Sequence, residues 1–99
     1  MAHRISAKAE TDLDDIWYFV ATESGSIAVA ERLIESIGDN ILLLARYPHL
    51  GRSRDSEFGP GTRSFAVGDY VIVYVIEKDD VWILRVVHGR RDLEALFRH

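Results

Sequence analysis

The sequence predicts an α+β fold in the order β-α-α-β-β-β, in which a helical hairpin packs on one face of an antiparallel sheet. Two observations predict this class. The first half of the 99 residues contains two stretches with apolar residues at helical spacing, separated by a short polar break. The last third contains three β-branched and aromatic runs separated by short turns. We expect residues 1–99 to form a single domain.

The N-terminal part predicts a short strand followed by a helix. His3-Arg4-Ile5 is β-prone, and Ser6 is a good N-cap for a helix over residues 7–23. Its apolar positions recur at intervals of three and four residues: Ala9, Leu13, Ile16, Trp17, Val20 and Ala21. Acidic residues outside this stripe lie near the helix start, where the helix dipole favours anions: Asp12, Asp14 and Asp15.

A second helix is predicted after a cap at Ser24 or Ser26, and it ends before Tyr47-Pro48 because the residue ahead of proline avoids helical geometry. The short connection makes the two helices an antiparallel hairpin. Leu42 and Leu43 lie beside the main apolar stripe of this helix. Two interpretations remain open at this point, a wide core, which we favour, and a surface for a partner.

The C-terminal half predicts a glycine- and proline-rich irregular loop and then a β-meander. The loop covers residues 48–61, and its length suggests a function. Strands are expected over residues 62–67, 70–76 and 81–87, with Gly68-Asp69 as a tight two-residue turn. The last stretch, from Arg91 to Phe97, predicts one or two helical turns anchored by Leu93, Leu96 and Phe97.

The turns also predict which residues share a face of the sheet. Pairing Val67 with Tyr70 sets Arg63 opposite Tyr74, and pairing Ile76 with Val81 sets Ile72 opposite Arg85. The face expected to pack on the helices is the smaller, aliphatic one: Ser64, Ala66, Val71, Val73, Val75, Trp82, Leu84 and Val86. The face expected to stay open mixes large apolar groups with two arginines: Arg63, Phe65, Ile72, Tyr74, Ile83 and Arg85. Such a face is typical of a docking surface.

Composition and charge exclude several function classes. The net charge of −4 and the pI near 5.5 disfavour nucleic-acid binding by the chain on its own, because phosphate recognition usually needs a broad basic face. No apolar run is long enough for a membrane span and no secretory signal is recognisable, so we expect a cytoplasmic protein. There is no cysteine, and the four histidines are scattered without ligand spacing. We therefore expect no metal and no cofactor.

The stretch VVHGRRD, from Val86 to Asp92, concentrates reactive side chains after the last strand. His88 could move a proton, while Arg90 and Arg91 could hold an anion. The same residues could equally form a charged rim that binds a protein. Gly89 is expected to let the chain bend away from the strand and turn His88 and the arginines outward.

Four stretches together resemble the ParE toxins of the RelE/ParE superfamily. They are AETDLDDIWYFV (residues 9–20), YPHLGRSR (47–54), GTRSFAVGDYVIVY (61–74) and VVHGRRDLEALF (86–97), and they cover nearly the whole chain in the family's order. The resemblance implies a toxin of a type II toxin–antitoxin module, of the kind linked to plasmid stabilisation. It further implies a cognate ParD-like antitoxin as partner and, for the ParE branch, DNA gyrase as the poisoned target.

The related RelE branch cuts mRNA on the ribosome, and it supplies the alternative function. By position, Arg63 and Arg85 match the arginines of that branch, and His88 matches a catalytic histidine of some members. The next position, where those members carry tyrosine, is Gly89 here, and the lysine-rich loop of RelE is absent. The resemblance therefore favours a binding toxin over a nuclease.

We expect the antitoxin to bury the open sheet face and the edge of the helical hairpin, with its acidic residues near Arg63, Arg85 or the Arg90-Arg91 pair. The residues expected to bind antitoxin or target are Arg63, Phe65, Ile72, Tyr74, Ile83, Arg85, His88, Arg90 and Arg91.

Overall fold

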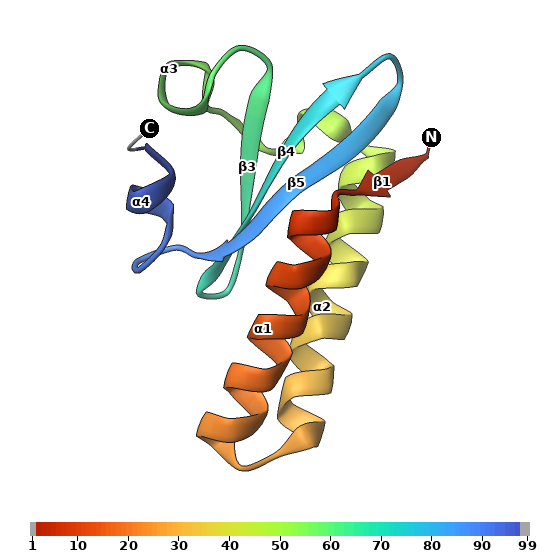
Figure 1. Ribbon diagram of the computed structural model, residues 1–99. Coiled ribbons are helices and arrows are strands. Elements are labelled where there is room, and N and C mark those ends of the chain that lie inside the picture. The colour runs from red at the N-terminus through yellow and green to blue at the C-terminus, as the bar shows by residue number, and fades with distance from the viewer. Residues whose placement is uncertain (1, 98–99) are drawn as a thin grey trace.

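A sheet with two long helices on one side forms the frame of the molecule (Figure 1). The computed structural model describes residues 2–97, without the side chains at positions 94 and 97. The elements in chain order are β1 (His3–Ile5), α1 (Ala7–Ser24), α2 (Ile27–Arg46), the 3-10 turn η1 (Pro48–Leu50), β2 (Arg52–Ser53), α3 (Asp55–Phe58), β3 (Thr62–Val67), β4 (Tyr70–Glu77), β5 (Asp80–His88) and α4 (Leu93–Phe97). The predicted α+β class is confirmed.

Both long helices begin at the residues that the sequence predicts. The Ser6 hydroxyl accepts a hydrogen bond from the Ala9 N–H, and Ser26 does the same for Val29, so each serine caps its helix. Between the helices Gly25 adopts a left-handed conformation with φ of 68°, which ends α1 and turns the chain. Neither helix of the described chain is long and apolar enough to cross a bilayer.

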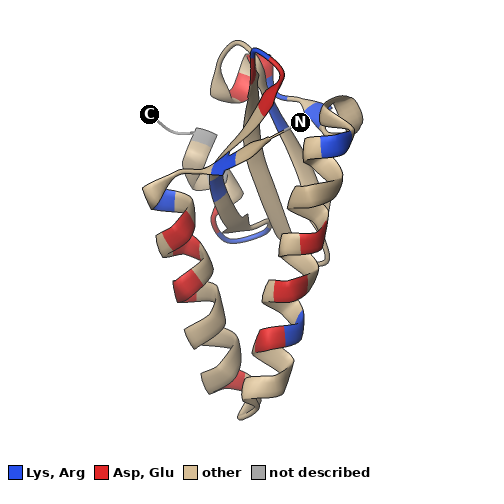
Figure 2. Cartoon of the chain, turned by 90° about the vertical axis from the view of Figure 1, so that its right-hand side faces the viewer, with Lys and Arg blue, Asp and Glu red and all other residues tan. Residues whose placement is uncertain are grey.

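The sheet has the strand order β1-β5-β4-β3-β2. Strands β2 to β5 pair antiparallel, as expected for a meander, whereas β1 pairs parallel with β5 from Val81 to Ile83. The sheet is therefore mixed, because the chain enters the opposite edge with β2 after the helical hairpin and then runs back through β3 and β4 to β5, beside β1. Figures 1 and 2 agree that α4 lies on the side of the sheet away from α1 and α2.

The expectation of an irregular loop over residues 48–61 is wrong. The segment folds into η1, the short strand β2 beside β3, and the single turn α3. At the C-terminal end, by contrast, α4 confirms the predicted helical turn. The anchoring role expected of Phe97 lies outside the described side chains.

The register of the first hairpin is confirmed, and that of the second is confirmed only near its turn. Val67 lies opposite Tyr70 and Tyr74 opposite Ile83, as predicted. A β-bulge then shifts the pairing, so that Val73 faces Arg85 and Ile72 faces Val86. The predicted pairing of Ile72 with Arg85 is wrong because β5 carries one extra residue there.

The predicted assignment of the two sheet faces is also wrong. Ile72, Tyr74 and Ile83 are completely buried in one cluster with residues of both long helices. Phe65 packs at the margin of this cluster. The larger side chains remove more apolar area from water, so they face the helices, and the expectation that they form an open docking face does not hold.

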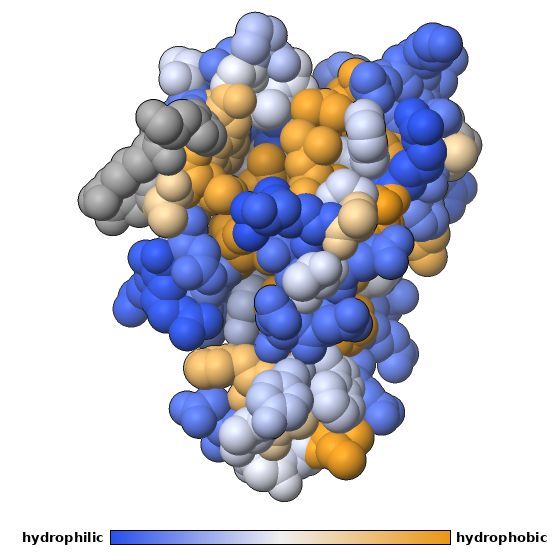
Figure 3. Space-filling model, in the orientation of Figure 1, coloured by the Kyte–Doolittle hydropathy of each residue, from blue (hydrophilic) through white to orange (hydrophobic). Residues whose placement is uncertain are grey.

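The opposite face carries most of the side chains that were expected to pack on the helices, whereas Val86 lies in the helix-facing cluster as predicted. Val71 and Val73 are buried, Val75, Trp82 and Leu84 are half-buried, and Ala66 is exposed. In Figure 3, apolar surface gathers over the upper part of β4 and β5 between charged side chains. We call the half-buried part of this surface, Val75, Trp82 and Leu84, the outer sheet face.

Candidate binding cleft

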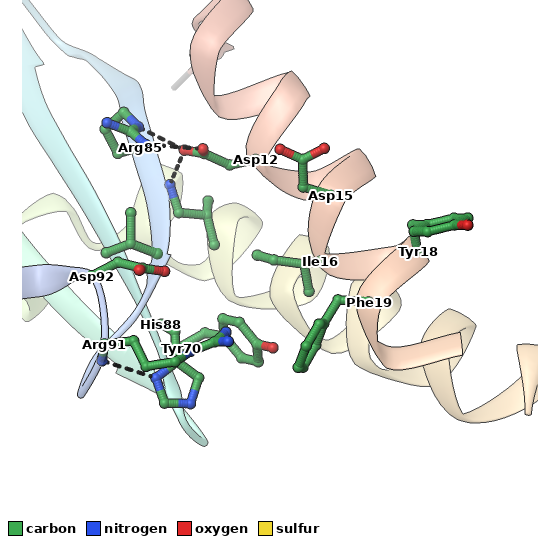
Figure 4. Close-up of a pocket in the computed structure, with 12 residues that line it drawn as sticks. Asp12, Asp15, Ile16, Tyr18, Phe19, Tyr70, Arg85, His88, Arg91 and Asp92 are labelled. Atoms are coloured by element: carbon green, nitrogen blue, oxygen red, sulfur yellow. Dashed lines mark hydrogen bonds and ion pairs between the residues drawn. The ribbon is translucent and has the colours of Figure 1, made fainter. Parts of the chain in front are cut away.

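A cleft of about 570 Å³ lies between α1, the end of β5 and the turn that follows β5 (Figure 4). Asp12 and Arg85 lie at one end of it, and Phe19, Tyr70 and His88 gather at the other. The lining residues are Asp12, Asp15, Ile16, Tyr18, Phe19, Tyr70, Arg85, Val86, Val87, His88, Arg91 and Asp92. The cleft therefore combines apolar and aromatic walls with charged groups of both signs.

The Asp12 carboxylate joins α1 to β5. Arg85 donates to it from Nε at 2.8 Å and from Nη2 at 3.1 Å, and the Val86 backbone N–H donates to Oδ2 at 2.9 Å. The hydrogen bonds that Arg85 donates to Asp12 raise the pKa of its guanidinium above the ordinary value, against the opposing effect of burial. This bidentate pair neutralises the arginine charge and orients its side chain.

The outer edge of β5 is paired with another strand before this ion pair and unpaired after it. Strand β1 covers the edge only as far as Ile83, and the Ser6 hydroxyl then donates to the Leu84 carbonyl. Asp12 takes the next outward N–H, at Val86. Beyond it, within residues 2–97, no strand pairs with this edge from Val86 to His88. An open strand edge walled by a helix is suited to bind an extended peptide.

The segment after β5 folds back on the cleft rather than pointing outward throughout. The His88 ring packs edge-on against Tyr70, with 5.4 Å between ring centroids, and its Nδ1 accepts a hydrogen bond from the Arg91 N–H. The Arg91 guanidinium lies 4.8 Å from the centroid of the Phe19 ring, in cation–π geometry. Arg90 is exposed. Burial raises the pKa of the Tyr70 phenol, which stays protonated at neutral pH.

Gly89 has a role different from the one expected. Its φ is not positive; instead its N–H donates to the Asp69 carbonyl at 2.8 Å. A Cβ at this position would lie 3.3 Å from the Val71 side chain. The glycine therefore permits a close approach between the two ends of the β4–β5 hairpin.

Arg63 lies outside the cleft, although it was predicted to act together with Arg85 and His88. Its Nε donates to the Gly51 carbonyl at 2.9 Å and its Nη2 to the His49 carbonyl at 3.1 Å. The arginine thus holds the chain around η1. Arg85 and His88 line the same cleft, but Arg63 does not join them.

Sequence reasoning missed Asp12, Tyr18, Phe19 and Tyr70 as residues of this cleft. Tyr18 and Phe19 directly follow two apolar stripe positions and are 70% and 43% exposed, which is a large area of aromatic surface. Asp12 was identified only as a favourable charge near a helix start. Its position on α1 and its side-chain type gave no signal for a partner in β5.

The guanidinium of Arg85 is already paired at this site. Among the described residues Arg85 is neutralised by Asp12, and no group of three candidate ligands gathers to hold a metal ion. A nuclease needs a proton-transfer pair and an available cationic clamp within reach of one phosphate. The apolar and aromatic walls are better suited to bind a polypeptide.

Three comparisons with known proteins agree with this architecture. A family model described as "ParE toxin of type II toxin-antitoxin system, parDE" matches residues 4–93. Two similar proteins come from Caulobacter vibrioides: Toxin ParE3, 36% identical over 84 residues, and Toxin ParE1, 33% identical over 93 residues. The first alignment covers 85% of this chain and 82% of its relative, and the second covers 94% of each.

Two solved structures share the fold. A chain from the chromosomal ParDE TA system of P. aeruginosa aligns with a TM-score of 0.76 at 23% identity, covering 89% of this chain and 95% of that one. A chain from the toxin–antitoxin complex RelBE2 of Mycobacterium tuberculosis aligns with a TM-score of 0.60 at 27% identity, covering 88% and 95%.

Proposed function

The chain belongs to the ParE toxin family of type II toxin–antitoxin systems, and we propose that it acts by binding and inhibiting DNA gyrase until a ParD-like antitoxin neutralises it. In this proposal the toxin holds a protein and breaks no covalent bond. The arrangement of the three residues that a nuclease would use is the observation that carries it.

Each of these three side chains is engaged within the chain. Arg63 donates to two backbone carbonyls near η1, Arg85 is paired with Asp12, and His88 accepts from the Arg91 N–H. A nuclease site built from them would have to break these interactions and also bring Arg63 to the other two. A binding toxin needs none of these changes.

The cleft supports the antitoxin part of the proposal. An extended antitoxin segment would pair with the open edge of β5 and place apolar side chains between Phe19 and Tyr70. Its acidic side chains would meet Arg90 and Arg91, which are both exposed. Arg63 and Arg85 are already satisfied within the chain, so they are weaker contacts for an acid than the sequence alone suggests.

The alternative function is ribosome-dependent mRNA cleavage of the RelE type. It draws support from one observation, namely that Arg85 and His88 line the same cleft. For this activity the Arg85–Asp12 pair would have to open on the ribosome, since a paired guanidinium cannot stabilise the charge of a cleaving phosphate as strongly.

A paired assay separates the two functions. Purified chain is added to DNA gyrase with relaxed plasmid, and separately to ribosomes programmed with mRNA. We expect supercoiling to be inhibited and mRNA to stay intact, with inhibition relieved by a stoichiometric amount of the antitoxin encoded beside this toxin. Cleaved mRNA that becomes intact in the His88→Ala variant would overturn the proposal in favour of the nuclease.

The antitoxin surface is tested separately by titrating that antitoxin into variants of the cleft. Tyr18→Glu and Phe19→Glu place a charge in the aromatic wall and should weaken binding at least tenfold. Ile27→Glu is the matched control, because Ile27 is also an exposed apolar residue of the hairpin but does not line the cleft. Equal affinity of all three variants and the wild type would show that the antitoxin binds elsewhere.

A further inference from the structure

We propose that the C-terminal end of α2 and the chain after it form a second docking surface, by which the toxin holds an acidic segment of its target protein. We call this surface the α2 corner and define it as Leu42, Leu43, Arg46, Tyr47, Leu50 and Arg52. The inference rests on the proposed function in one respect, since it takes the chain to be a toxin that binds a protein target.

The corner exposes more apolar surface than its position in the fold requires. Leu42 is 57% exposed, Leu43 38%, Tyr47 53% and Leu50 49%. A hollow of about 400 Å³ lies among the side chains from Arg46 to Leu50. The interpretation of Leu42 and Leu43 as part of a wide core is therefore wrong. The other interpretation that the sequence left open, a surface for a partner, stays a prediction.

The backbone of the corner is fixed by hydrogen bonds with two side chains of the sheet. The buried Tyr74 hydroxyl donates to the Pro48 carbonyl at 2.6 Å and accepts from the Gly51 N–H at 2.9 Å. Arg63 adds its hydrogen bonds to the carbonyls of His49 and Gly51. When the backbone is already fixed, binding costs less conformational entropy, and apolar side chains on it can contribute more to affinity. Arg63 and Tyr74 thus act as positioning residues for this surface.

The charge of the corner determines the chemistry of the partner. Residues 42–54 contain three arginines and no acidic residue, although the whole chain has a net charge of −4. Figure 2 shows the contrast, with basic residues at this end of α2 and acidic residues further down both long helices. Within the described chain Arg54 is paired with Glu57, whereas Arg46 and Arg52 have no ion pair. Two available cations beside leucines and a tyrosine complement an acidic, amphipathic protein segment.

A nucleic acid fits this surface less well than a protein does. Leu42, Leu43 and Leu50 offer neither stacking faces nor hydrogen-bond donors for bases or phosphates. The acidic residues of α1 and α2 would also repel a phosphate backbone that extends beyond the corner.

The corner and the cleft share no lining residue, because the corner comes from the end of α2 and η1, whereas the cleft comes from α1 and β5. Separate surfaces allow the antitoxin and the target to be recognised by different side chains. We therefore expect that some variants lose toxicity but still bind the antitoxin.

Two double variants of the full chain test this. Leu42→Glu/Leu50→Glu removes the apolar contact, and Arg46→Glu/Arg52→Glu reverses the charge, with Ile27→Glu as the control at the other end of α2. The readouts are growth inhibition after induction in bacterial cells without antitoxin, and affinity for the purified antitoxin. All four affected side chains are exposed, and a thermal melt of each variant in complex with the antitoxin verifies the fold.

We expect both double variants to need at least tenfold more protein for the same growth inhibition, with antitoxin affinity within twofold of the wild type, and Ile27→Glu to match the wild type in both. Undiminished toxicity, or a tenfold loss of antitoxin affinity, would overturn the inference. If only the leucine variant lost toxicity, the partner segment would not be acidic. A wild-type chain that is dimeric at micromolar concentration and becomes monomeric in either double variant would show that a second copy covers the corner.

Gyrase inhibition is then measured with the same proteins. If toxicity depends on the corner but purified gyrase is unaffected even by the wild type, the proposed target is wrong while the docking surface stands. If the wild type does not inhibit growth at all, the proposed function fails and the inference fails with it.

Discussion

At the scale of single residues, Asp12 is the side chain that connects the two halves of the fold. Its carboxylate is only 13% exposed and accepts from Arg85 and from the Val86 backbone. Replacing it by alanine leaves a half-buried guanidinium and a backbone N–H without their partner. We expect Asp12→Ala to lower the free energy of unfolding by about 2–3 kcal/mol.

Chemical denaturation measures this loss, and Asp14→Ala is the matched control. Asp14 lies on the same helix and is exposed, so its removal should change stability by less than about 0.5 kcal/mol. Equal effects of the two variants would mean that the Asp12–Arg85 pair contributes nothing beyond a surface charge.

Gly51 is the second residue on which local geometry depends. Its φ of −70° suits any residue, but a methyl group there would overlap the Tyr74 hydroxyl and lie 2.7 Å from Tyr74 Cε1 and 2.9 Å from the Ser64 carbonyl oxygen. We expect Gly51→Ala to cost about 2–3 kcal/mol, because the buried ring cannot move without disturbing the core. Gly38→Ala, inside α2 with no atom near its added methyl, should instead stabilise the chain by about 1 kcal/mol. Thermal melts of both variants test the contrast, and a stabilising Gly51→Ala would contradict the described packing.

At the scale of elements, the short helix α3 carries a carboxyl group, Glu57, whose pKa is lowered in the folded chain. Arg54 donates to Glu57 at 2.8 Å, and this hydrogen bond, followed by one from Ser56, lowers the pKa of the Glu57 carboxyl below its ordinary value of 4.5. The folded state then binds fewer protons than the unfolded state, so the stabilisation is present above pH 4.5 and is lost as the pH falls through the lowered pKa.

Glu57→Gln removes this titration. The difference in unfolding free energy between wild type and variant should be largest near pH 6 and should shrink toward pH 3, in denaturation curves recorded at both values. A difference that stays constant or grows on acidification would show that the Glu57 pKa is not lowered in the folded chain.

The helices and the first hairpin could be predicted from the sequence because their signals are local. Ser6 and Ser26 lie within three residues of the N–H groups that they cap. The two-residue turn at Gly68-Asp69, where Gly68 has φ of 59°, fixes the register of β3 and β4.

The bulge and the sheet faces could not be predicted because they depend on distant contacts. Asp12 and Arg85 are 73 residues apart, so the sequence around β5 does not show the ion pair that accompanies the bulge and the burial of Val86. Strand β4 is apolar on both faces, so its own pattern does not tell which side meets the helices. The regular structure around η1 also depends on a distant contact, because the Tyr74 hydroxyl accepts a hydrogen bond from the Gly51 N–H, 23 residues away.

At the scale of the whole molecule, we propose that the toxin has two binding surfaces. The cleft between α1 and β5 would bind the antitoxin, and the α2 corner would bind the target. The outer sheet face is formed by side chains of β4 and β5 and would offer further apolar area to the antitoxin. Its half-buried side chains, Val75, Trp82 and Leu84, replace the residues that the sequence assigned to the open face.

Pairing of the antitoxin with β5 has a direct spectroscopic consequence. The Val86 N–H points outward to Asp12, so by the alternation of an antiparallel ladder the His88 N–H also points to the open edge. We expect amide exchange at His88 to slow at least tenfold when the antitoxin binds, as measured by NMR on the complex and the free toxin. The amide of Gly89, already bonded to Asp69, is the internal reference. Unchanged exchange at His88 would exclude strand addition at this edge.

The central claim is that this toxin holds a protein and does not cut RNA, and growth inhibition by the His88→Ala variant tests it most directly. His88 is the side chain of the cleft that matches a catalytic histidine of the RelE branch by position, so a nuclease of that type would lose its toxicity with it. We predict that His88→Ala, expressed without antitoxin, stops growth at the same expression level as the wild type. Survival of cells that contain the folded variant would contradict the account.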